Sequence, residues 1–281
     1  MSGKSTVPAR VLRLAPWQRI NHFVGMDAIS SKPNLVRTLR RLPPGQEVSP
    51  QAWLLPGEAS LFAAALSSNP LKGGKTFIVK PEAECQGRGI FLARRPDDVP
   101  RGKLESGSFV AQQYVERPLL LDGFKFDLRL YVLVTSAAPL RDFLFDDGLV
   151  RLCASPYMQP RSSNLASATV HLTNFAINRQ AEAAAMVTSK PAAASGAAGA
   201  PYRSGAGASV PAAPSPQGVP PADVADALGG SQCKRSIHWL MRHLRSLGID
   251  SAAVWARVAD CVNRTLLAAR PELEHGYVAA S

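Results

Sequence analysis

A segment rich in small residues and proline divides this chain of 281 residues into two parts. Of the 40 residues from Ala181 to Pro220, 30 are Ala, Pro, Gly or Ser, and only three are charged. Such a segment has little large apolar area to offset the entropy that is lost on ordering. We therefore predict a disordered insert over residues 180–230, and we expect the folded structure to form from the residues before and after it.

The residues before the insert carry the pattern of β-strands. From Phe124 to Val134 the apolar residues fall mainly on even positions, which is the two-residue period of a strand with one buried face. Lys125, Asp127 and Arg129 then share the opposite face. Further strands are predicted at 76–79, 90–92, 109–115, 143–145 and 149–153, the last two joined by a hairpin turn at 146–148, where Asp-Gly is typical of such turns.

The residues after the insert change to a helical period. Ile237, Leu240, Met241, Leu244 and Leu247 follow helical spacing, and Gly248 is expected to end that helix. A second helix is predicted to begin with a cap at Asp250 or Ser251 and to end at Pro271. Two helices packed on a mixed sheet give an α+β or α/β architecture.

The composition excludes several classes of protein. Lys and Arg outnumber Asp and Glu by 32 to 21, which favours an acidic partner or surface. We find neither an apolar run long enough for a membrane span nor an ordinary secretory signal, so we expect no membrane partner and a cytoplasmic location. The four cysteines are far apart in the sequence, which argues against a zinc or redox motif. The basic residues are spread along the chain, so no nucleic-acid partner is expected.

Three short segments carry residues suited to chemistry. The glycine turn at 85–89 follows Lys80 and contains Arg88, and backbone N–H groups in such a turn can approach phosphate closely. Taken alone, a strand, a glycine turn and a second strand are more often a plain hairpin. The charged face of the 124–134 strand is either a solvated face or the floor of a cleft for a polyanionic substrate and a metal. The segment 171–174, taken alone, is typical of a strand edge with capping polar residues.

Taken together, these segments resemble the tubulin tyrosine ligase-like family, and the resemblance spans nearly all of the chain outside the insert. Agreement by chance across so many motifs in the family order is negligible. Lys125–Asp127 and the run 131–136 are most similar to the glutamate-adding branch of the family. The motifs are Pro-Trp-Gln-Arg-Ile-Asn-His-Phe at 16–23, Pro-Gln-Ala-Trp-Leu-Leu-Pro at 50–56, Ile-Val-Lys-Pro at 78–81, Gln-Gly-Arg-Gly-Ile at 86–90, Gln-Gln-Tyr-Val at 112–115, Asp-Gly-Phe-Lys-Phe-Asp-Leu-Arg at 122–129 and His-Leu-Thr-Asn at 171–174.

The resemblance implies an ATP-grasp-like fold, in which two lobes close on ATP. It places a partial N-terminal domain over 1–70, a central lobe over 71–115, and an incomplete C-terminal lobe over 116–179 and 231–281. The implied ATP-binding residues are Lys80, Gln86, Gly87, Arg88, Gly89, Ile90, Gln112, Gln113, Tyr114, Val115, Lys125, Asp127, Thr173 and Asn174. The implied catalytic residues are Arg88, Arg129 and Arg151, and the implied amino-acid-binding residues are Arg151, Arg88 and Arg179.

The resemblance also implies a reaction. ATP phosphorylates the γ-carboxyl of a glutamate in the acidic C-terminal tail of tubulin, and the amine of free glutamate attacks the acyl phosphate. ATP and Mg²⁺ are therefore the implied cofactors, and Arg151 would hold the carboxylate of the incoming amino acid through its bidentate fork. By the same resemblance we expect a monomer that works on the cytoskeleton, including the cilium, its basal body and axoneme.

The sequence departs from the family pattern in two places. No Glu-x-Asn occurs after Thr173, so we expect this chain to lack the final metal-binding strands of the family and to resemble a C-terminally truncated form. No metal ligand is assigned. Phe175-Ala176 replaces the family's Tyr-Ser, and Arg179 replaces its Lys, which removes two hydroxyls from the expected amino-acid site. A truncated, non-catalytic relative that binds tubulin or nucleotide without ligation is therefore the alternative.

Overall fold

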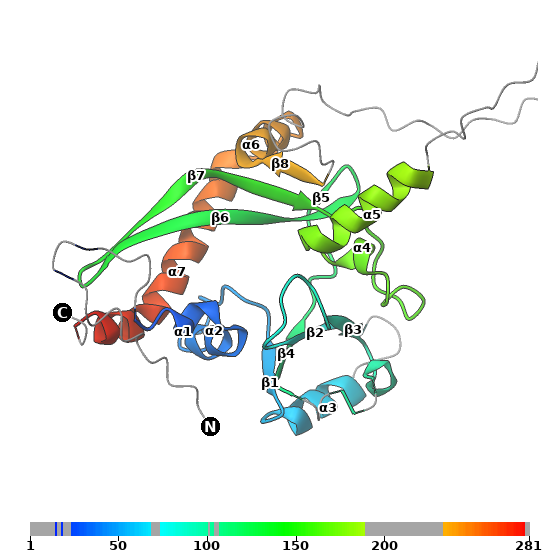
Figure 1. Cartoon of the computed structure of the whole chain (residues 1–281), viewed down its shortest axis with the longest axis horizontal. Coiled ribbons are helices and arrows are strands. Elements are labelled where there is room, and N and C mark those ends of the chain that lie inside the picture. Colours follow the sequence, from blue (N-terminus) through cyan, green and yellow to red (C-terminus); the bar gives the residue numbers. More distant parts are fainter. Residues whose placement is uncertain are drawn as a thin grey trace, which may run out of the picture.

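The computed structural model describes residues 15, 18, 24–68, 74–100, 102–103, 107–188 and 233–278. Within these residues two four-stranded sheets form the body of the protein, and helices cover one face of each (Figure 1). The α+β class and an ATP-grasp-like arrangement are confirmed. Each strand pair in the two sheets is antiparallel, so the mixed pairing expected from the sequence is not present among the described strands.

The first sheet comes from the N-terminal part of the chain. Its strands lie in the order β1 (Ala52–Leu55), β4 (Phe109–Gln113), β2 (Phe77–Pro81) and β3 (Phe91–Ala93), which confirms the three predicted strands of this region. Helix α3 (Ala59–Ser67) covers one face. There Trp53, Phe62 and Phe77 pack with ring centroids 5.5 or 5.6 Å apart. Because side chains alternate along a strand, the opposite face carries Lys80 and Gln112.

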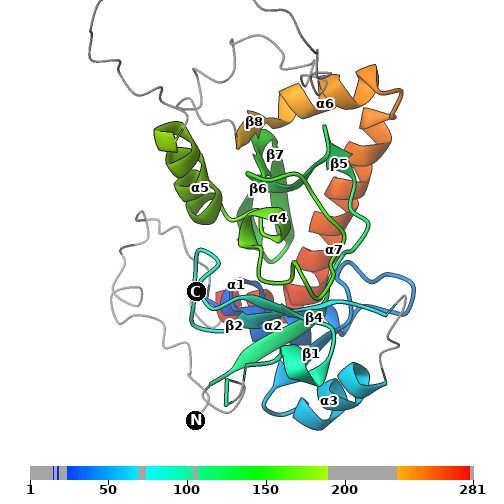
Figure 2. The same cartoon turned by 90° about the vertical axis from the view of Figure 1, so that its right-hand side faces the viewer.

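The second sheet is built on a long two-stranded ribbon. Its strands lie in the order β5 (Leu120–Leu121), β6 (Phe124–Ala137), β7 (Leu140–Leu152) and β8 (Lys234–Ser236). The predicted strand over 124–134 is confirmed and continues to Ala137. Figure 2 shows the two sheets as separate layers, with the short helix α4 (Ala168–His171) between them.

The predicted hairpin turn at 146–148 is wrong, because these residues lie inside β7 and the chain reverses between Ala137 and Leu140 instead. Leu130 pairs with Gly148 and the next pair joins Val132 to Leu144, so the Asp-Asp-Gly residues form an irregularity in the ladder. A Cβ at Gly148 would lie 2.4 Å from the carbonyl oxygen of Arg129, which explains the glycine without a turn. The Asp147 carboxylate accepts a hydrogen bond from the Ile237 backbone N–H at 2.9 Å.

Helices α6 (Ile237–Ser246) and α7 (Ser251–Val278) cover the apolar face of the ribbon, as the helical period predicts. Gly248 separates them with φ of +74°, and the Asp250 carboxylate caps α7 by accepting from the backbone N–H groups of Ala252 and Ala253. The buried core between helix and sheet consists of Leu121, Val150, Ile237, Trp239, Leu240 and Leu244.

The prediction that Pro271 ends the second helix is wrong. Helix α7 continues through Pro271 to Val278, although an interior proline removes one backbone hydrogen bond. Packing offsets this loss, because Leu273 is fully buried against Ala137 and Ala269. A Cβ at Gly276 would lie 2.5 Å from the carbonyl oxygen of Val24, so the last turns of α7 lie directly against the backbone at Val24. The neighbouring helices α1 (Asp27–Ser30) and α2 (Lys32–Leu39) also contact α7.

The remaining elements lie near the insert. Residues 171–174 end helix α4 and lead into α5 (Phe175–Thr188), so they do not form a strand edge. Helix α5 also includes residues 180–188, which the sequence assigns to the disordered insert. The alanines there extend the helix until proline and glycine become frequent. Residues 189–230 of the predicted insert lie outside the described residues. A short 3-10 helix, η2, covers Pro96–Asp98.

Candidate active site

Two lysines from different sheets face the space between the sheets. Lys80 Nζ donates to Gln112 Oε1 at 2.8 Å. Lys125 Nζ donates to the Tyr114 hydroxyl at 2.6 Å and to the His171 carbonyl oxygen at 2.9 Å. In the part of the chain that the structure describes, neither ammonium group is in an ion pair. The two cations therefore lie in the same region without a paired carboxylate.

Burial perturbs both lysines. It is the main cause that lowers the pKa of Lys125 to about 8, and the nearby charge of Lys80 acts in the same direction. Burial also lowers the pKa of Lys80, with a smaller contribution from the charge of Lys32. Because a nearby anion would favour the charged form of each lysine, this region is suited to binding a strongly negative group.

Tyr114 and His171 accept the hydrogen bonds of Lys125 and contact each other. Tyr114 is 5% exposed, and its hydroxyl lies 3.3 Å from both His171 Nδ1 and the His171 carbonyl oxygen. His171 Nε2 lies 3.1 Å from the Asn164 carbonyl oxygen, which can only accept, so this nitrogen carries the ring proton. Burial lowers the pKa of His171, which keeps the ring neutral. The pair thus fixes the position of the Lys125 ammonium group.

Asp127 connects strand β6 to β7 and to the segment before α5. Arg151 lies directly opposite Asp127 in the ladder and donates to both carboxylate oxygens, Nε at 2.7 Å and Nη2 at 2.6 Å. Thr173 Oγ1 donates to the same carboxylate at 2.8 Å. The hydrogen bond to Asp127 is the main cause that raises the pKa of Arg151. The structure therefore brings together three of the expected site residues.

The glycine loop lies against the start of helix α5. Gln86 and Gly87 both have positive φ, 59° and 86°, a conformation that favours glycine. A Cβ at Gly87 would lie 2.5 Å from Ile177 Cδ1 and 3.1 Å from the Asn174 side chain. The loop that follows Lys80 and the Thr-Asn segment are thus in close contact, although they are far apart in the sequence.

Several expected site residues are not hydrogen-bonded to either lysine in the part of the chain that the structure describes. The Arg88 side chain is 68% exposed and pairs with Glu84 at 3.2 Å. Arg129 follows Asp127 on the same face of β6, and its side chain is exposed. Arg179 is exposed on α5, and Val115 is 51% exposed beyond the end of β4. Gln113 lies within β4, half-buried.

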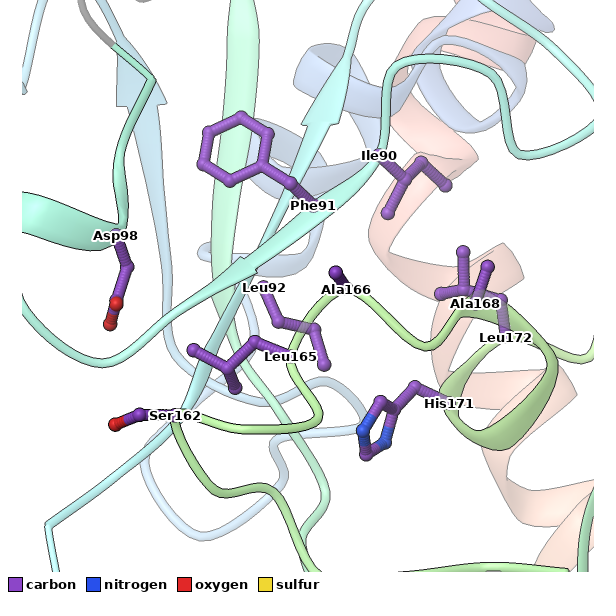
Figure 3. A pocket seen from close by; sticks show the side chains of 10 residues that line it. All are labelled: Ile90, Phe91, Leu92, Asp98, Ser162, Leu165, Ala166, Ala168, His171 and Leu172. Carbon is purple, nitrogen blue, oxygen red and sulfur yellow. The ribbon is translucent and has the colours of Figure 1, made fainter.

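A cavity of about 390 Å³ opens between β3 and the segment around α4 (Figure 3). Its lining is largely apolar, and among the expected ATP-binding residues it includes Ile90. Neither lysine of the pair is among its lining residues, which are Ile90, Phe91, Leu92, Asp98, Ser162, Leu165, Ala166, Ala168, His171 and Leu172.

Sequence reasoning missed three residues of this region. His171 lies in the His-Leu-Thr-Asn motif, in which only Thr173 and Asn174 are expected site residues, although its carbonyl oxygen accepts a hydrogen bond from Lys125. Lys32 donates to the carbonyl oxygens of Glu82 and Glu84, at 3.1 and 2.7 Å, and so holds the start of the glycine loop. Lys234 lies 3.5 Å from the centroid of the Phe175 ring. No local signal could have found Lys32 or Lys234, because their partners are remote in the sequence.

The described residues do not form a magnesium site. No group of three His, Cys, Asp or Glu side chains among them is placed to hold a metal ion, and Asp127 already binds Arg151 and Thr173. All four cysteines are free thiols. Across the helices that the structure describes, none combines the length and hydropathy required to cross a membrane.

Comparison with known proteins shows what this chain resembles. Residues 11–194 match the model of the tubulin-tyrosine ligase family. Tubulin polyglutamylase ttll6 of Danio rerio is 35% identical over 95% of this chain and 29% of its own length. Tubulin polyglutamylase TTLL13 of Homo sapiens is 34% identical over 95% of this chain and 28% of its own length. A probable beta-tubulin polyglutamylase of Tetrahymena thermophila is 42% identical over 61% of this chain and 14% of its own length.

The chain thus spans less than a third of the length of these relatives. The family model covers more than half of the chain, and it includes both lysines of the pair, Asp127, Arg151 and the Thr-Asn segment. This chain belongs to the tubulin-tyrosine ligase family.

Proposed function

We propose that this protein is an ATP-dependent ligase that adds glutamate to γ-carboxyl groups of glutamates in tubulin C-terminal tails. The observation that carries the proposal is the pair Lys80 and Lys125, two ammonium groups from two sheets that form no ion pair with the described residues. The relatives that match over most of the chain are named tubulin polyglutamylases, which supports the substrate and the added amino acid.

Lys80 and Lys125 are suited to hold the phosphates of ATP. The glycine loop would add the backbone N–H of Gly87, a position where a side chain would collide with Ile177 of α5. Residues 112–115 and Ile90 would contact the adenine, and the apolar cavity beside Ile90 offers space for a flat ring. Asp127, Thr173 and Asn174 would complete the nucleotide site between the lysines and the amino-acid site.

The proposed reaction has two steps. The γ-phosphoryl group passes from ATP to a γ-carboxylate oxygen of the tail glutamate, and ADP leaves. The amine nitrogen of free glutamate then attacks the carbonyl carbon, inorganic phosphate leaves, and the nitrogen loses a proton. Catalysis of this kind depends on positioning and on neutralising charge, which the two lysines supply at the phosphates. Mg²⁺ would add to this neutralisation in a complete site, but the described residues do not form its site.

The arginines would bind the carboxylates of the substrates. Arg151 uses Nε and Nη2 on Asp127, which leaves Nη1 for the carboxylate of the incoming amino acid. Arg129 lies beside it on the same face, and Arg88 in the glycine loop and Arg179 on α5 are both exposed. The net charge of +11 favours the approach of an acidic tail and a place on the cytoskeleton.

A second candidate is a relative that binds nucleotide or tubulin without ligation. The observation that favours it is the lack of a metal-holding group among the described residues. The two candidates differ in one outcome, since only the ligase changes the mass of the tubulin tail.

The test is to incubate the purified chain with microtubules, ATP, Mg²⁺ and isotopically labelled glutamate. Mass spectrometry of the tubulin tails should show the gain of labelled glutamyl residues. The matched control is Lys125→Met, which removes one ammonium group and should abolish the gain while the protein stays folded. Tails that bind the chain but gain no glutamate would support the non-catalytic candidate, and they would overturn the ligase.

A further inference from the structure

Lys234 and Arg151 lie beside each other on neighbouring strands, and with Phe175 and Arg179 they form a group that we call the Phe175 cluster. Lys234 and Arg151 are directly opposite each other in the β7–β8 ladder, so their side chains leave the sheet on the same face. Like charges at directly opposite positions destabilise a sheet. Asp127 neutralises Arg151, but no ion pair joins Lys234 to an acidic residue in the part of the chain that the structure describes. Lys234 thus faces a neutralised arginine and, among the described residues, has the Phe175 ring as its printed contact and no carboxylate of its own.

A second cation approaches the same point from helix α5. Phe175, Arg179 and Glu182 recur at helical spacing, so they share one face of α5, and that face lies against β8. The Glu182 carboxylate accepts a hydrogen bond from the Cys233 backbone N–H at 2.8 Å, which fixes the helix to the strand next to Lys234. Lys234 lies 3.5 Å and the Arg179 guanidinium 5.8 Å from the centroid of the Phe175 ring.

The cluster is continuous with the expected amino-acid site. Phe175 directly follows Asn174 and Thr173, and Thr173 shares the Asp127 carboxylate with Arg151. The Phe175 ring thus contacts two cations, Lys234 and Arg179. Lys234 is the direct ladder neighbour of Arg151, whose guanidinium is expected to bind an α-carboxylate. The described residues place no carboxylate in an ion pair with Lys234 or Arg179, so this pair is suited to a negative group that comes from a ligand.

We infer that Lys234, with Arg179, binds the side-chain carboxylate of the free amino acid and selects a dicarboxylic amino acid over neutral ones. This inference rests on the proposed ligase function and names the residue that sets its substrate class. The amino acid would lie along the β7–β8 pair, with its α-carboxylate at Arg151 and its side-chain carboxylate at Lys234. An uncharged side chain would leave both cations of the Phe175 cluster without a partner.

The test compares L-glutamate with L-glutamine, which has nearly the same shape and no side-chain charge. Each is titrated calorimetrically into the purified chain in the presence of a non-hydrolysable ATP analogue. The wild type should bind glutamate about 10- to 100-fold more tightly than glutamine, as the loss of a charged hydrogen bond requires. Lys234→Met should bring the two affinities to within a few-fold, and Lys234→Arg should restore the preference.

The matched control is Arg242→Met, which removes one positive charge from an exposed position on α6. It should leave the preference for glutamate unchanged, which separates a local contact from a change in net charge. Equal binding of both amino acids by the wild type, or a folded Lys234→Met protein that keeps the wild-type preference, would overturn the inference.

The labelled-glutamate assay separates this inference from the proposed function. If the wild type and Lys234→Met both ligate glutamate and prefer it over glutamine equally, the role of Lys234 is wrong and the proposed ligase function is supported. If glutamate binding is selective and depends on Lys234 but no ligation occurs, the ligase function is wrong and the role of Lys234 is supported.

Discussion

Arg151 and Asp127 lie directly opposite each other on β7 and β6, and the guanidinium donates to both oxygens of the carboxylate at 2.7 and 2.6 Å. The side chains are 19% and 36% exposed, so the pair is only partly accessible to water. This geometry holds the guanidinium plane in one orientation and leaves Nη1 outside the pair. Arg151 is therefore positioned before any amino acid arrives, and a bound carboxylate would add to the pair.

Arg151→Lys keeps the positive charge but removes the guanidinium, which can donate two parallel hydrogen bonds to one carboxylate. We expect a loss of about 1 kcal/mol of stability and an increase of about 10- to 100-fold in the glutamate concentration needed for half-maximal ligation. The affinity for ATP should change little, because in the proposed site the phosphates are bound by Lys80 and Lys125 and not by Arg151. Arg141→Lys, at an exposed position on β7, is the control and should change neither quantity. An unchanged glutamate requirement in Arg151→Lys would show that another residue binds the carboxylate.

Gly87 and Gly45 have nearly the same φ, +86° and +84°, but different surroundings. A Cβ at Gly87 would lie 2.5 Å from Ile177 Cδ1, whereas a Cβ at Gly45 would meet nothing within 4 Å. Gly45→Ala should therefore lower the free energy of unfolding by about 1–2 kcal/mol, which is the cost of placing alanine in the left-handed conformation. Gly87→Ala should cost more and should also weaken ATP binding, because the loop must move away from α5. Thermal unfolding and calorimetry measure both effects, and equal losses in the two variants would contradict the contact with Ile177.

The strands and helices were largely predictable because their signals are local. The alternation at 124–134 and the helical spacing after Ile237 both depend on one buried face, and both are confirmed. The predicted turn at 146–148 was wrong because Asp-Asp-Gly fits a turn as well as it fits an irregular strand. The close approach of Gly148 to Arg129 belongs to a partner strand that the local sequence does not specify.

The candidate site was predictable only where a motif carried it. Lys80, Lys125, Asp127 and Thr173 lie in motifs, and the structure places them around one space. The contact of Lys234 with Phe175 joins residues on either side of the low-complexity segment, and no periodicity relates them. The position of Arg88 depends on its pairing with Glu84 in an exposed loop, which sequence reasoning could not distinguish from a phosphate contact.

Leu273 tests whether α7 continues through Pro271. It is fully buried beyond the proline, whereas Leu267 on the same helix is 56% exposed. Leu273→Ala should lower the free energy of unfolding by about 2–5 kcal/mol, because it opens a cavity against Ala137 and Ala269. Leu267→Ala should change it by less than about 0.5 kcal/mol. Chemical denaturation measures both, and equal small effects would mean that the helix ends near Pro271 after all.

The depressed pKa of Lys125 predicts how nucleotide binding depends on pH. Burial lowers this pKa to about 8 from an ordinary value of 10.5, so the ammonium group has lost its proton in about half of the molecules at pH 8. Phosphate favours the charged form, so ATP binding should take up a proton near pH 8–9 and weaken as the pH rises further. The stability of the free protein depends on pH in the opposite direction. The unfolded chain holds this proton more tightly than the folded protein, so Lys125 increases the free energy of unfolding as the pH rises from about 8 towards 10.5. Calorimetry in two buffers with different ionisation enthalpies measures the proton uptake. Lys125→Arg keeps its charge over this range and should remove the uptake. Wild-type binding that takes up no proton at pH 8–9 would show that Lys125 does not contact the phosphates.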